Sequence, residues 1–499
     1  MARIRHGLSK FDQFICETTV TNTDFVELPQ NFGRLGPRNE VTGSGFVPER
    51  VIKAFGKALD GMRDTKDQTS SVEAGMTFFG QFIDHDVTLD ATSAIGTRID
   101  PQTIRNVRTP ALELDNVYGD GPEATPHLYS KAHKGYLLFG SRDNPLDLAR
   151  NCDETALIGD PRNDENQIVS QIQGAFIALH NILLSKVEAE SGHNLMDCAF
   201  EGVRSHVQST LMAPDEMPFE AARRLVRLHY QYLVLHDFLP AFVDKKVLEG
   251  VLKAFLRGTP PKPFKAMSPL VPVEFSVAAF RFGHATVQNE YTFKKGFRLG
   301  LFDAGFLGSG KRDPKHNIEF RHIFDFGDGT AFDKARPISR KLAASIFDLP
   351  FVTDPIRFDN VEISLEDAKK LPHRNVFRDR FALLVASGQQ MARLMNVPEL
   401  RAPSELRKQG ITKTPLWYYC LQEAEKHGGK LGPVGGTIVT GVLIRMLMHD
   451  SEPILNNPGF EPLPELFGGG KRFTLGRLLK FIEENRDAAH KGKTLFCPR

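Results

Sequence analysis

The chain reads Gly80-Gln81-Phe82-Ile83-Asp84-His85-Asp86 where a predicted buried helix comes to its end. Gln81 and His85 are four residues apart, so a helix places them on one face, and Asp84 points close to the same face. Burying polar side chains costs free energy unless each finds a partner. Four polar side chains at the end of an apolar helix therefore indicate a functional site, with a structural role or a simple metal site as the alternatives.

Helical periodicity is the dominant pattern in the rest of the chain. Apolar residues recur at spacings of three or four in two long runs, which are Ile168, Ile172, Phe176, Leu179 and Leu183, and then Leu225, Leu228, Tyr232, Leu235 and Leu239. Pro240 is predicted to end the second helix, and Ser70 with Glu73 predicts a capping box that opens a helix running through Asp84. Alternating strand patterns are short and few, so the predicted fold class is mainly α.

The bulk composition is that of a globular protein with a large core. The 499 residues are 41% hydrophobic and 25% charged, which is ordinary for such proteins. A net charge of +2 argues against nucleic acid as the main partner, because duplex binders carry a basic excess. No run of about eighteen apolar residues appears, so no membrane span is expected. The basic N-terminus lacks the apolar stretch of a signal peptide, which leaves a cytoplasmic location or non-classical export.

The cysteines indicate isolated thiols in a reducing compartment. They are odd in number and contain no Cys-x-x-Cys pair, which argues against a zinc ribbon, a thioredoxin-type site and a thioether-attached cofactor. The five residues are Cys16, Cys152, Cys198, Cys420 and Cys497.

Two further segments carry polar residues that a core does not require. The first reads Ile158-Gly159-Asp160-Pro161-Arg162-Asn163-Asp164-Glu165-Asn166-Gln167 and leads into the helix near Ile168. Residues 163–166 supply capping groups for that helix, whereas an arginine beside a carboxylate more often binds an anion or a cofactor. The second reads Ala279-Phe280-Arg281-Phe282-Gly283-His284-Ala285. Its glycine lets a bulky group approach the backbone beside the histidine, although a lone histidine is more often a core residue.

Together the three segments resemble the animal haem peroxidase family. Gln-Phe-Ile-Asp-His-Asp is similar to the distal motif of that family, and Gly-Asp-Pro-Arg-Asn-Asp-Glu-Asn to the distal arginine motif of its bacterial branch. Phe-Arg-Phe-Gly-His is similar to the proximal motif. The resemblance runs in the right order from about residue 70 to about residue 445. It implies one large helical haem peroxidase domain with few short strands over residues 41–499, after an irregular arm over residues 1–40.

The resemblance implies a role for each of the main polar residues. His284 is the implied axial ligand of the iron in haem b, and His85 is the implied distal acid–base. Arg162 is implied as the cationic partner of His85, and Gln81 as the residue that places water or halide. One neutral imidazole can carry a proton between the two peroxide oxygens, and a fixed guanidinium stabilises charge on the departing oxygen. The implied reaction reduces hydrogen peroxide, passes through an oxidised ferryl haem and draws electrons from a small donor.

Two carboxylates and one amide complete the implied haem contacts. Asp84 and Glu165 stand at the two positions that form esters with haem methyl groups in the family. The residue after Glu165 is Asn166 rather than methionine, so the third, sulfonium link cannot form there. The asparagine that receives the hydrogen bond of the proximal histidine in the family is replaced, and Gln389 aligns best with it.

A fourth segment, residues 109–119, resembles the calcium loop of the family. Its implied ligands are oxygens of alternate residues together with the aspartate after the distal histidine, namely Thr109, the carbonyl of Ala111, Glu113, Asp115 and Asp86. These are the hard oxygen ligands that calcium requires. Glu113 stands where the family has aspartate, and a strand edge with its acids in water is the alternative interpretation.

Two other functions compete with the peroxidase. A haem fatty-acid dioxygenase of the same superfamily uses a tyrosine three residues before the proximal histidine, and here that residue is Arg281. A non-enzymatic adhesion or scaffold protein with a peroxidase fold is expected to lose the distal groups, all of which are present. The residues do not distinguish bromide, iodide, thiocyanate and small phenols as the electron donor, and they do not give the oligomeric state.

Overall fold

The structure is a computed structural model of the chain and describes most of its length. The described residues are 30–39, 49–89, 105–106, 108, 111–189, 193–200, 217–264, 270–308, 310–358, 361–449, 454–456, 459–469 and 471–496. Most of the expected N-terminal arm lies outside them, as does one expected calcium ligand, Thr109. The boundary near residue 40 therefore stays a prediction.

Helices form the body of the described chain. The α-helices are α2 (Glu49–Asp60), α3 (Gly75–Val87), α4 (Asp115–Tyr118), α5 (Gly121–Ala124), α6 (Gln167–Glu188), α7 (His193–Phe200), α9 (Met217–Leu233), α10 (Leu239–Phe242), α11 (Lys245–Leu256), α12 (Leu365–Ala368), α13 (Leu371–Phe377), α14 (Gly388–Met395), α15 (Ser404–Arg407), α16 (Leu416–Ala424), α17 (Pro433–His449) and α18 (Leu475–His490). The strands are β1 (Gln30–Asn31), β2 (Arg63–Asp64), β3 (Arg105–Asn106), β4 (Glu290–Lys294), β5 (Phe297–Gly300), β6 (Leu342–Ala343), β7 (Ile356–Phe358) and β8 (Val361–Ile363). They pair two by two, as β1–β3, β2–β6, β4–β5 and β7–β8. The predicted fold class, mainly α with few short strands, is confirmed.

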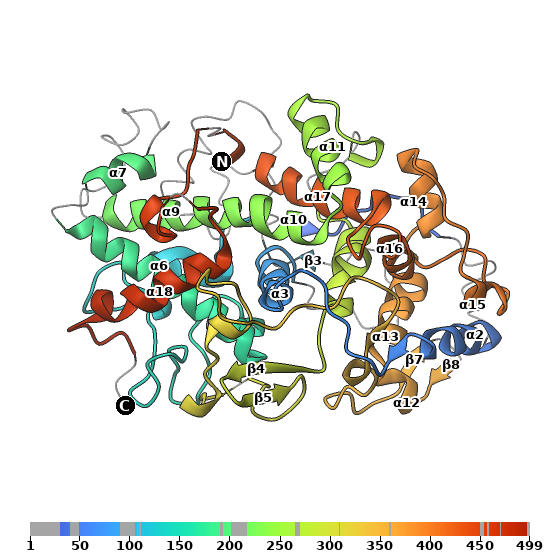
Figure 1. The fold of residues 1–499 in the computed structure, drawn as a ribbon, viewed down its shortest axis with the longest axis horizontal. Helices are drawn as coiled ribbons and strands as arrows, with labels where there is room; N and C mark the ends of the chain where they lie inside the picture. The colour runs from blue at the N-terminus through green and yellow to red at the C-terminus, as the bar shows by residue number, and fades with distance from the viewer. Residues whose placement is uncertain are drawn as a thin grey trace.

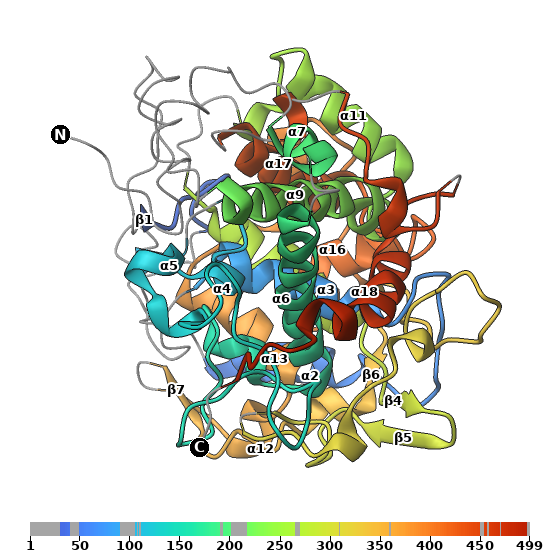
Figure 2. The same ribbon diagram turned by 90° about the vertical axis from the view of Figure 1, so that its left-hand side faces the viewer.

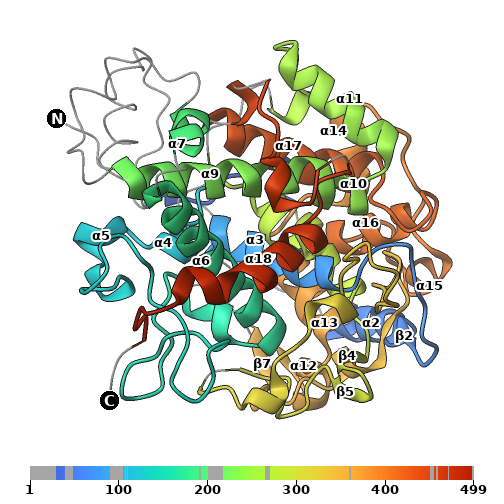
Figure 3. The same ribbon diagram turned by 60° about the vertical axis from the view of Figure 1, so that its left-hand side comes forward.

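Helix α3, which carries the distal residues, lies near the centre of the molecule in all three views (Figure 1, Figure 2 and Figure 3). Every residue of α3 is buried except Gly80 and Gln81. Helix α6 packs against α3 on one side and against α9 and α18 on others. Polar side chains of α3 are therefore enclosed by helices rather than displayed on the surface.

The long helix α6 begins where the sequence predicts a cap. The side chain of Asn166 accepts a hydrogen bond from the backbone N–H of Val169 at 3.0 Å, which satisfies one of the free donors at a helix start. All five apolar residues of the predicted run are buried in α6. The cap and the periodicity together confirm the helix predicted from residue 168 onward.

The start of α3 differs from the prediction, because no capping box forms between Ser70 and Glu73. Ser70 Oγ donates to the carbonyl of Ala335 at 2.9 Å, and Glu73 Oε1 accepts from the backbone N–H of Asp325 at 2.8 Å. The helix begins at Gly75 instead, where an added Cβ would lie 2.2 Å from the ring of Phe324. Only glycine permits this close approach.

Three π-helical turns occur within the described part of the chain. They are η5 (Val234–Phe238) between α9 and α10, η7 (Glu274–Ala279) before the 3₁₀ helix η8 (Phe280–Ala285), and η12 (Arg378–Ala382) directly after α13. The prediction that Pro240 ends its helix is wrong, because α10 continues to Phe242. After the wide turn η5, Pro240 stands at the start of a new α-helical segment, where its missing N–H costs little.

One helix of the described chain, α6, has the length and apolar composition of a membrane span. However, 94% of its most apolar window is buried inside the protein. The apolar composition of α6 thus fits its place as a central core helix, against which α3, α9 and α18 pack.

Candidate active site

A single cavity of about 700 Å³ brings the three predicted segments together. Its polar lining includes Gln81, Asp84, His85, Arg162, Glu165 and His284. Much of the rest of its wall is aromatic, with Phe78, Phe238, Phe242, Phe280, Phe282, Phe302, Phe306 and Phe351. Helix α3 is joined to the segment after η8 by a hydrogen bond between the hydroxyls of Thr77 and Thr286 at 2.9 Å. A volume of this size suits a bound cofactor or a small molecule.

A chain of hydrogen bonds runs from His85 into the protein. His85 Nδ1 lies 2.7 Å from Oδ1 of Asn163, and Nδ2 of Asn163 donates to Oε1 of Gln173 at 2.8 Å. Nε2 of Gln173 in turn donates to the backbone carbonyl of Asn116 at 3.0 Å. A carbonyl can only accept, so each amide in the chain has one possible orientation.

This orientation fixes the tautomer of His85. Because Asn163 presents its oxygen, His85 Nδ1 must carry the proton, and Nε2 keeps its lone pair. Burial is the main cause that lowers the pKa of His85, and the charge of Arg162 lowers it further, to about 4. The imidazole is therefore neutral at neutral pH and is ready to accept a proton at Nε2.

Arg162 lies on the 3₁₀ helix η3 (Pro161–Asp164) and is held on one side by Asp160. Its Nε and Nη2 donate to the two oxygens of that carboxylate at 3.1 and 2.8 Å, and its Nη2 also donates to the carbonyls of His85 and Thr88 at 3.1 and 2.6 Å. Arg108 donates to Asp160 from the other side at 2.6 Å. Nη1 of Arg162 makes no hydrogen bond within the described residues, which leaves it available to a ligand.

Asp160 stays charged in spite of its complete burial. Burial alone would raise the pKa of its carboxyl, but the hydrogen bonds and charge of Arg162 and the charge of Arg108 outweigh that effect and lower it. The sequence pattern drew attention to Arg162 alone. The structure shows that an aspartate shared by two arginines holds it in place.

The two carboxylates predicted to bind the cofactor both line the cavity, and both have protein partners. Glu165 accepts a hydrogen bond from Nε2 of Gln81, while Oε1 of Gln81 accepts from Asn166 at 3.1 Å. Burial raises the pKa of Glu165 to about 7, although Arg162 opposes the shift. Asp84 forms an ion pair with Arg281, Nη1 to Oδ2, at 3.7 Å.

His284 lies on η8, directly after the wide turn η7, and lines the cavity beside Gly283. Apart from the two chain neighbours, no atom of the described residues lies within 4 Å of the position that a Cβ on Gly283 would take, so the open space expected beside the histidine is present. The backbone before it is anchored by Nε1 of Trp417, which donates to the carbonyl of Arg281 at 3.1 Å. Burial, with a smaller effect of Arg281, lowers the pKa of His284 to about 3 and keeps the ring neutral.

The partner of His284 is Asn375 on α13, and the prediction of Gln389 in this role is wrong. Nδ2 of the Asn375 side chain lies 2.9 Å from Nδ1 of His284. A turn of this amide by 180° brings its oxygen to Nδ1, where it accepts the ring proton and leaves Nε2 free to bind a metal. Gln389 instead donates to the Leu400 carbonyl at 3.0 Å and to Thr414 at 2.9 Å, which fixes the start of α14 away from the cavity.

The predicted calcium residues that lie within the described chain form one buried acidic cluster. Asp86, Glu113 and Asp115 are at most 2% exposed. Burial, followed by the charges of Asp115 and Glu113, raises the pKa of Asp86 well above its usual value. Oδ2 of Asp86 accepts from the hydroxyl of Tyr230 at 3.0 Å, whereas Oδ1 has no hydrogen-bond partner among the residues that the structure describes. Leu114, between the two loop acids, has a left-handed backbone with φ of 64°.

Two positioning residues were missed by the sequence analysis. Asn163 was interpreted as part of the capping group, but the caps are Asp160 for η3 and Asn166 for α6. Its position directly after Arg162 in a polar turn is the one signal that marks it. Asn375 carries a weaker signal, a buried polar residue between the apolar residues of a short helix.

Comparison with known proteins relates this chain to one protein family. Residues 91–300, which include Arg162 and His284, match the model of the animal haem peroxidase family. Peroxidasin of Drosophila melanogaster is 22% identical over 392 residues, which are 76% of this chain and 24% of that protein. Thyroid peroxidase of Sus scrofa is 26% identical over 208 residues, which are 38% of this chain and 20% of that protein. The chain thus spans a quarter or less of the length of these curated relatives.

Solved structures share the fold. Peroxidase A from Dictyostelium discoideum matches with a TM-score of 0.59 at 14% identity, over 95% of each chain. Fatty acid alpha-dioxygenase of Arabidopsis thaliana matches with a TM-score of 0.59 at 13% identity, over 93% of this chain and 78% of the other. At these identities the likeness concerns the fold alone.

Proposed function

Because this chain contains an animal haem peroxidase domain, we propose that it is a haem peroxidase, which reduces hydrogen peroxide and oxidises a small donor. The single observation that carries the proposal is the fixed tautomer of His85. Its Nε2 is held unprotonated at a cavity that also contains a guanidinium and a second neutral histidine, His284.

The cavity fits a haem in its shape and in its chemistry. His284 is neutral, contacts Asn375 at Nδ1 and has open space beside Gly283, so its Nε2 would hold the haem iron. The aromatic walls suit the faces of a flat apolar ring system. The haem, when bound, supplies the redox chemistry, and the protein supplies orientation and electrostatics.

The distal residues supply proton transfer and charge stabilisation. His85 Nε2 accepts the first proton of hydrogen peroxide, and the resulting imidazolium returns that proton to the oxygen that leaves. The hydrogen bond from Nδ1 to Asn163 keeps the ring oriented through both transfers. Arg162, held by Asp160, directs positive charge at the developing negative charge.

The cavity suggests two classes of donor. Arg162 and Arg281 both line it, and two guanidinium groups attract halide or thiocyanate. Phe302 and Phe351 also line it with ring centroids 6.0 Å apart. Since Phe351 is 63% exposed, this pair marks the opening of the cavity and offers a stacking surface for a small phenol.

The dioxygenase alternative has less support. Although dioxygenases share the fold, the side chain three residues before His284 is Arg281, which donates to the Ser276 carbonyl and pairs with Asp84. A guanidinium cannot form the radical that a tyrosine provides.

We propose calcium as a second cofactor, bound by Asp86, Glu113 and Asp115 with the carbonyl of Ala111 and with Thr109. Three carboxylates buried together repel one another and favour a cation among them. Arg108 supplies one positive charge at 3.4 Å from Asp115, and the unsatisfied Oδ1 of Asp86 is the oxygen best placed for a metal. Since Asp86 follows His85 on α3, this metal would also hold the backbone of His85 in position.

We further propose that Asp84 and Glu165 would form ester links to the haem. In each link a carboxylate O–C bond replaces a C–H bond of a haem methyl group, and hydrogen peroxide, the oxidant of the proposed activity, takes up the two electrons and is reduced to water. Both line the cavity, and Glu165, with its pKa raised to about 7 by burial, is protonated in part at neutral pH. A protonated carboxyl is easier to desolvate against an apolar group than a charged one.

The proposed activity is tested with the haem-loaded chain in a steady-state assay that supplies peroxide and either a halide or a phenol. We expect peroxide-dependent oxidation of at least one donor, and a loss of about 10²- to 10⁴-fold for His85→Ala. His180→Ala is the matched control, because His180 is equally buried but does not line the cavity. Haem-loaded protein that oxidises none of the donors would contradict the proposal.

A further inference from the structure

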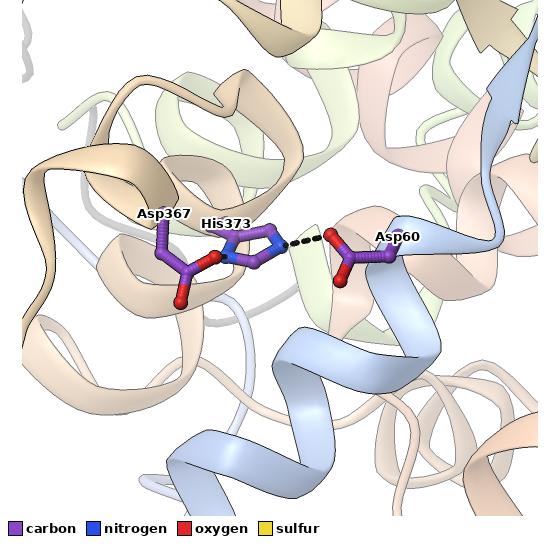
Figure 4. Close-up of side chains that lie close together, drawn as sticks. All are labelled: Asp60, Asp367 and His373. Carbon is purple, nitrogen blue, oxygen red and sulfur yellow. Dashed lines mark ion pairs between the residues drawn. The ribbon is translucent and has the colours of Figure 1, made fainter.

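A second polar cluster lies outside the cavity, where the end of α2 meets α12 and α13. Asp60 is the last residue of α2, Asp367 lies on α12, and His373 lies on α13. Figure 4 shows the imidazole between the two carboxylates. Nε2 of His373 is 3.3 Å from Asp60 Oδ1, and Nδ1 is 3.7 Å from Asp367 Oδ1. One potential ligand atom from each residue lies within 4.8 Å of the others.

A cation already stands among these ligand atoms. The ammonium of Lys370 lies 3.0 Å from Oδ1 of Asp60 and 2.9 Å from Oδ1 of Asp367. A third carboxylate, Glu366, lies 3.6 Å from the same nitrogen. The side chain of Lys370 is 15% exposed, and its flexible stem can carry the ammonium out into solvent. The arrangement of oxygens is thus one that accommodates positive charge at a defined point.

His373 is the feature that an ordinary ion-pair cluster does not explain. It is 1% exposed, and its nitrogens face the two carboxylates at 3.3 and 3.7 Å without the alignment of a good hydrogen bond in the described residues. A buried imidazole whose contacts are only long ion pairs is poorly satisfied, and native proteins rarely keep such a group without a reason.

We propose that Asp60, Asp367 and His373 form a binding site for a divalent transition metal ion, and that Lys370 is the cation that takes its place when the metal is absent. One imidazole with two carboxylates is a donor set suited to Zn²⁺ or Mn²⁺. Glu366 is in position to give a further oxygen. Calcium is less suited to the site, because it prefers six or more oxygens.

The metal would join two parts of the fold that are far apart in sequence. It would tie α2, near the start of the described chain, to α13, whose Asn375 contacts His284. A ligand that binds only the folded state raises stability by mass action. Metal binding should therefore raise the melting temperature of the full chain.

The test is titration of the full chain with Zn²⁺, followed by calorimetry and by thermal denaturation. Excess Ca²⁺ is present so that the acidic cluster around Asp86 does not take up the probe. We expect one Zn²⁺ ion to bind with a rise in Tm that a chelator reverses. Lys370→Met should tighten binding by about tenfold or more, because the competing ammonium is gone, and His373→Gln should weaken it by about tenfold or more.

His427→Gln is the matched control, since His427 pairs with the single carboxylate of Asp244 at 3.2 Å and should not contribute. Asp367→Asn gives the same readout as His373→Gln if that variant yields little folded protein. The proposal is overturned if the wild-type chain binds no Zn²⁺ at millimolar concentration, or if wild type and both Asp367→Asn and His373→Gln bind it equally.

Discussion

Asn163 fixes the proton of His85, because its Oδ1 lies 2.7 Å from Nδ1 of that histidine and its Nδ2 is engaged by Gln173. The fixed point of the arrangement is the backbone carbonyl of Asn116, which can only accept. The tautomer of His85 is thereby set by a main-chain carbonyl that lies three residues along the hydrogen-bonded path from it.

Replacing Asn163 with leucine should slow the reaction with hydrogen peroxide by about 10- to 100-fold, because misorientation of a catalytic base removes part of its 10²- to 10⁴-fold contribution. The measurement is the second-order rate constant by stopped flow. Asn181→Leu is the control, since Asn181 is buried on α6 and bonds to Leu137 instead. Equal rates in Asn163→Leu and wild type would show that the tautomer is set by other means.

The rate constant for peroxide should depend on pH through His85. The protonated ring cannot accept a proton, and its pKa is about 4, so the rate should be level near neutral pH and fall as the pH drops through about 4. Asn163→Asp places a negative charge beside Nδ1, which stabilises the imidazolium and should move the fall to higher pH. An acid limb that stays in place in this variant would contradict the role given to the pair.

Asn375 and Gln389 can be compared directly on the proximal side. Asn375→Leu should shift the haem spectrum and the reduction potential, because it removes the partner of His284 Nδ1. Gln389→Leu should leave both unchanged, since Gln389 contacts Leu400 and Thr414. The opposite pattern would restore Gln389 as the proximal partner.

Covalent attachment of haem is tested by acid extraction into an organic solvent after limited exposure to peroxide. We expect part of the haem to stay with the protein, and Asp84→Ala and Glu165→Ala each to remove one link. Only the double variant should release all of it. Complete extraction of the haem from the peroxide-treated wild type would contradict the proposal. Asp84 and Glu165 would then serve only as partners of Arg281 and Gln81.

Removal of calcium should lower activity and thermal stability together. A metal bound by Asp86 would hold both the acidic cluster and the neighbouring His85, so a strong chelator should lower Tm and the peroxide rate in parallel, and added Ca²⁺ should restore both. Glu113→Gln should mimic the chelator in part. Full activity in protein shown by elemental analysis to hold no metal would refute the idea.

The residues proposed to carry the chemistry could be predicted from sequence because their types are costly to bury. Gln81, His85 and His284 stand out as polar groups among apolar ones, Arg162 as an arginine beside a carboxylate, and all four line one cavity. Helix α6 was equally accessible to prediction, since local periodicity and one cap define it.

The residues that hold this chemistry in place were harder to predict, because their role depends on packing between distant elements. Asn163 has the same local pattern whether it caps a helix or faces His85. Asn375 and Gln389 are both buried amides on helices after His284, and only the position of α13 against η8 decides between them. Pro240 shows the same limit of prediction. The sequence rule that proline ends a helix fails here, because the helix widens at η5 and a new α-helical segment starts around Pro240.

The three wide turns make the cavity sensitive to insertion and deletion rather than to substitution. One of them, η5, contains Phe238 of the wall, η7 directly precedes the segment of His284, and η12 directly follows the helix of Asn375. Removing one residue from such a turn restores ordinary α-helical winding and rotates everything beyond it by about 100° about the helix axis. A substitution in one of these turns alters single contacts, whereas a change in its length reorients a whole wall of the cavity. Natural differences in the shape of this cavity should therefore appear as insertions or deletions at these three turns when related sequences are aligned.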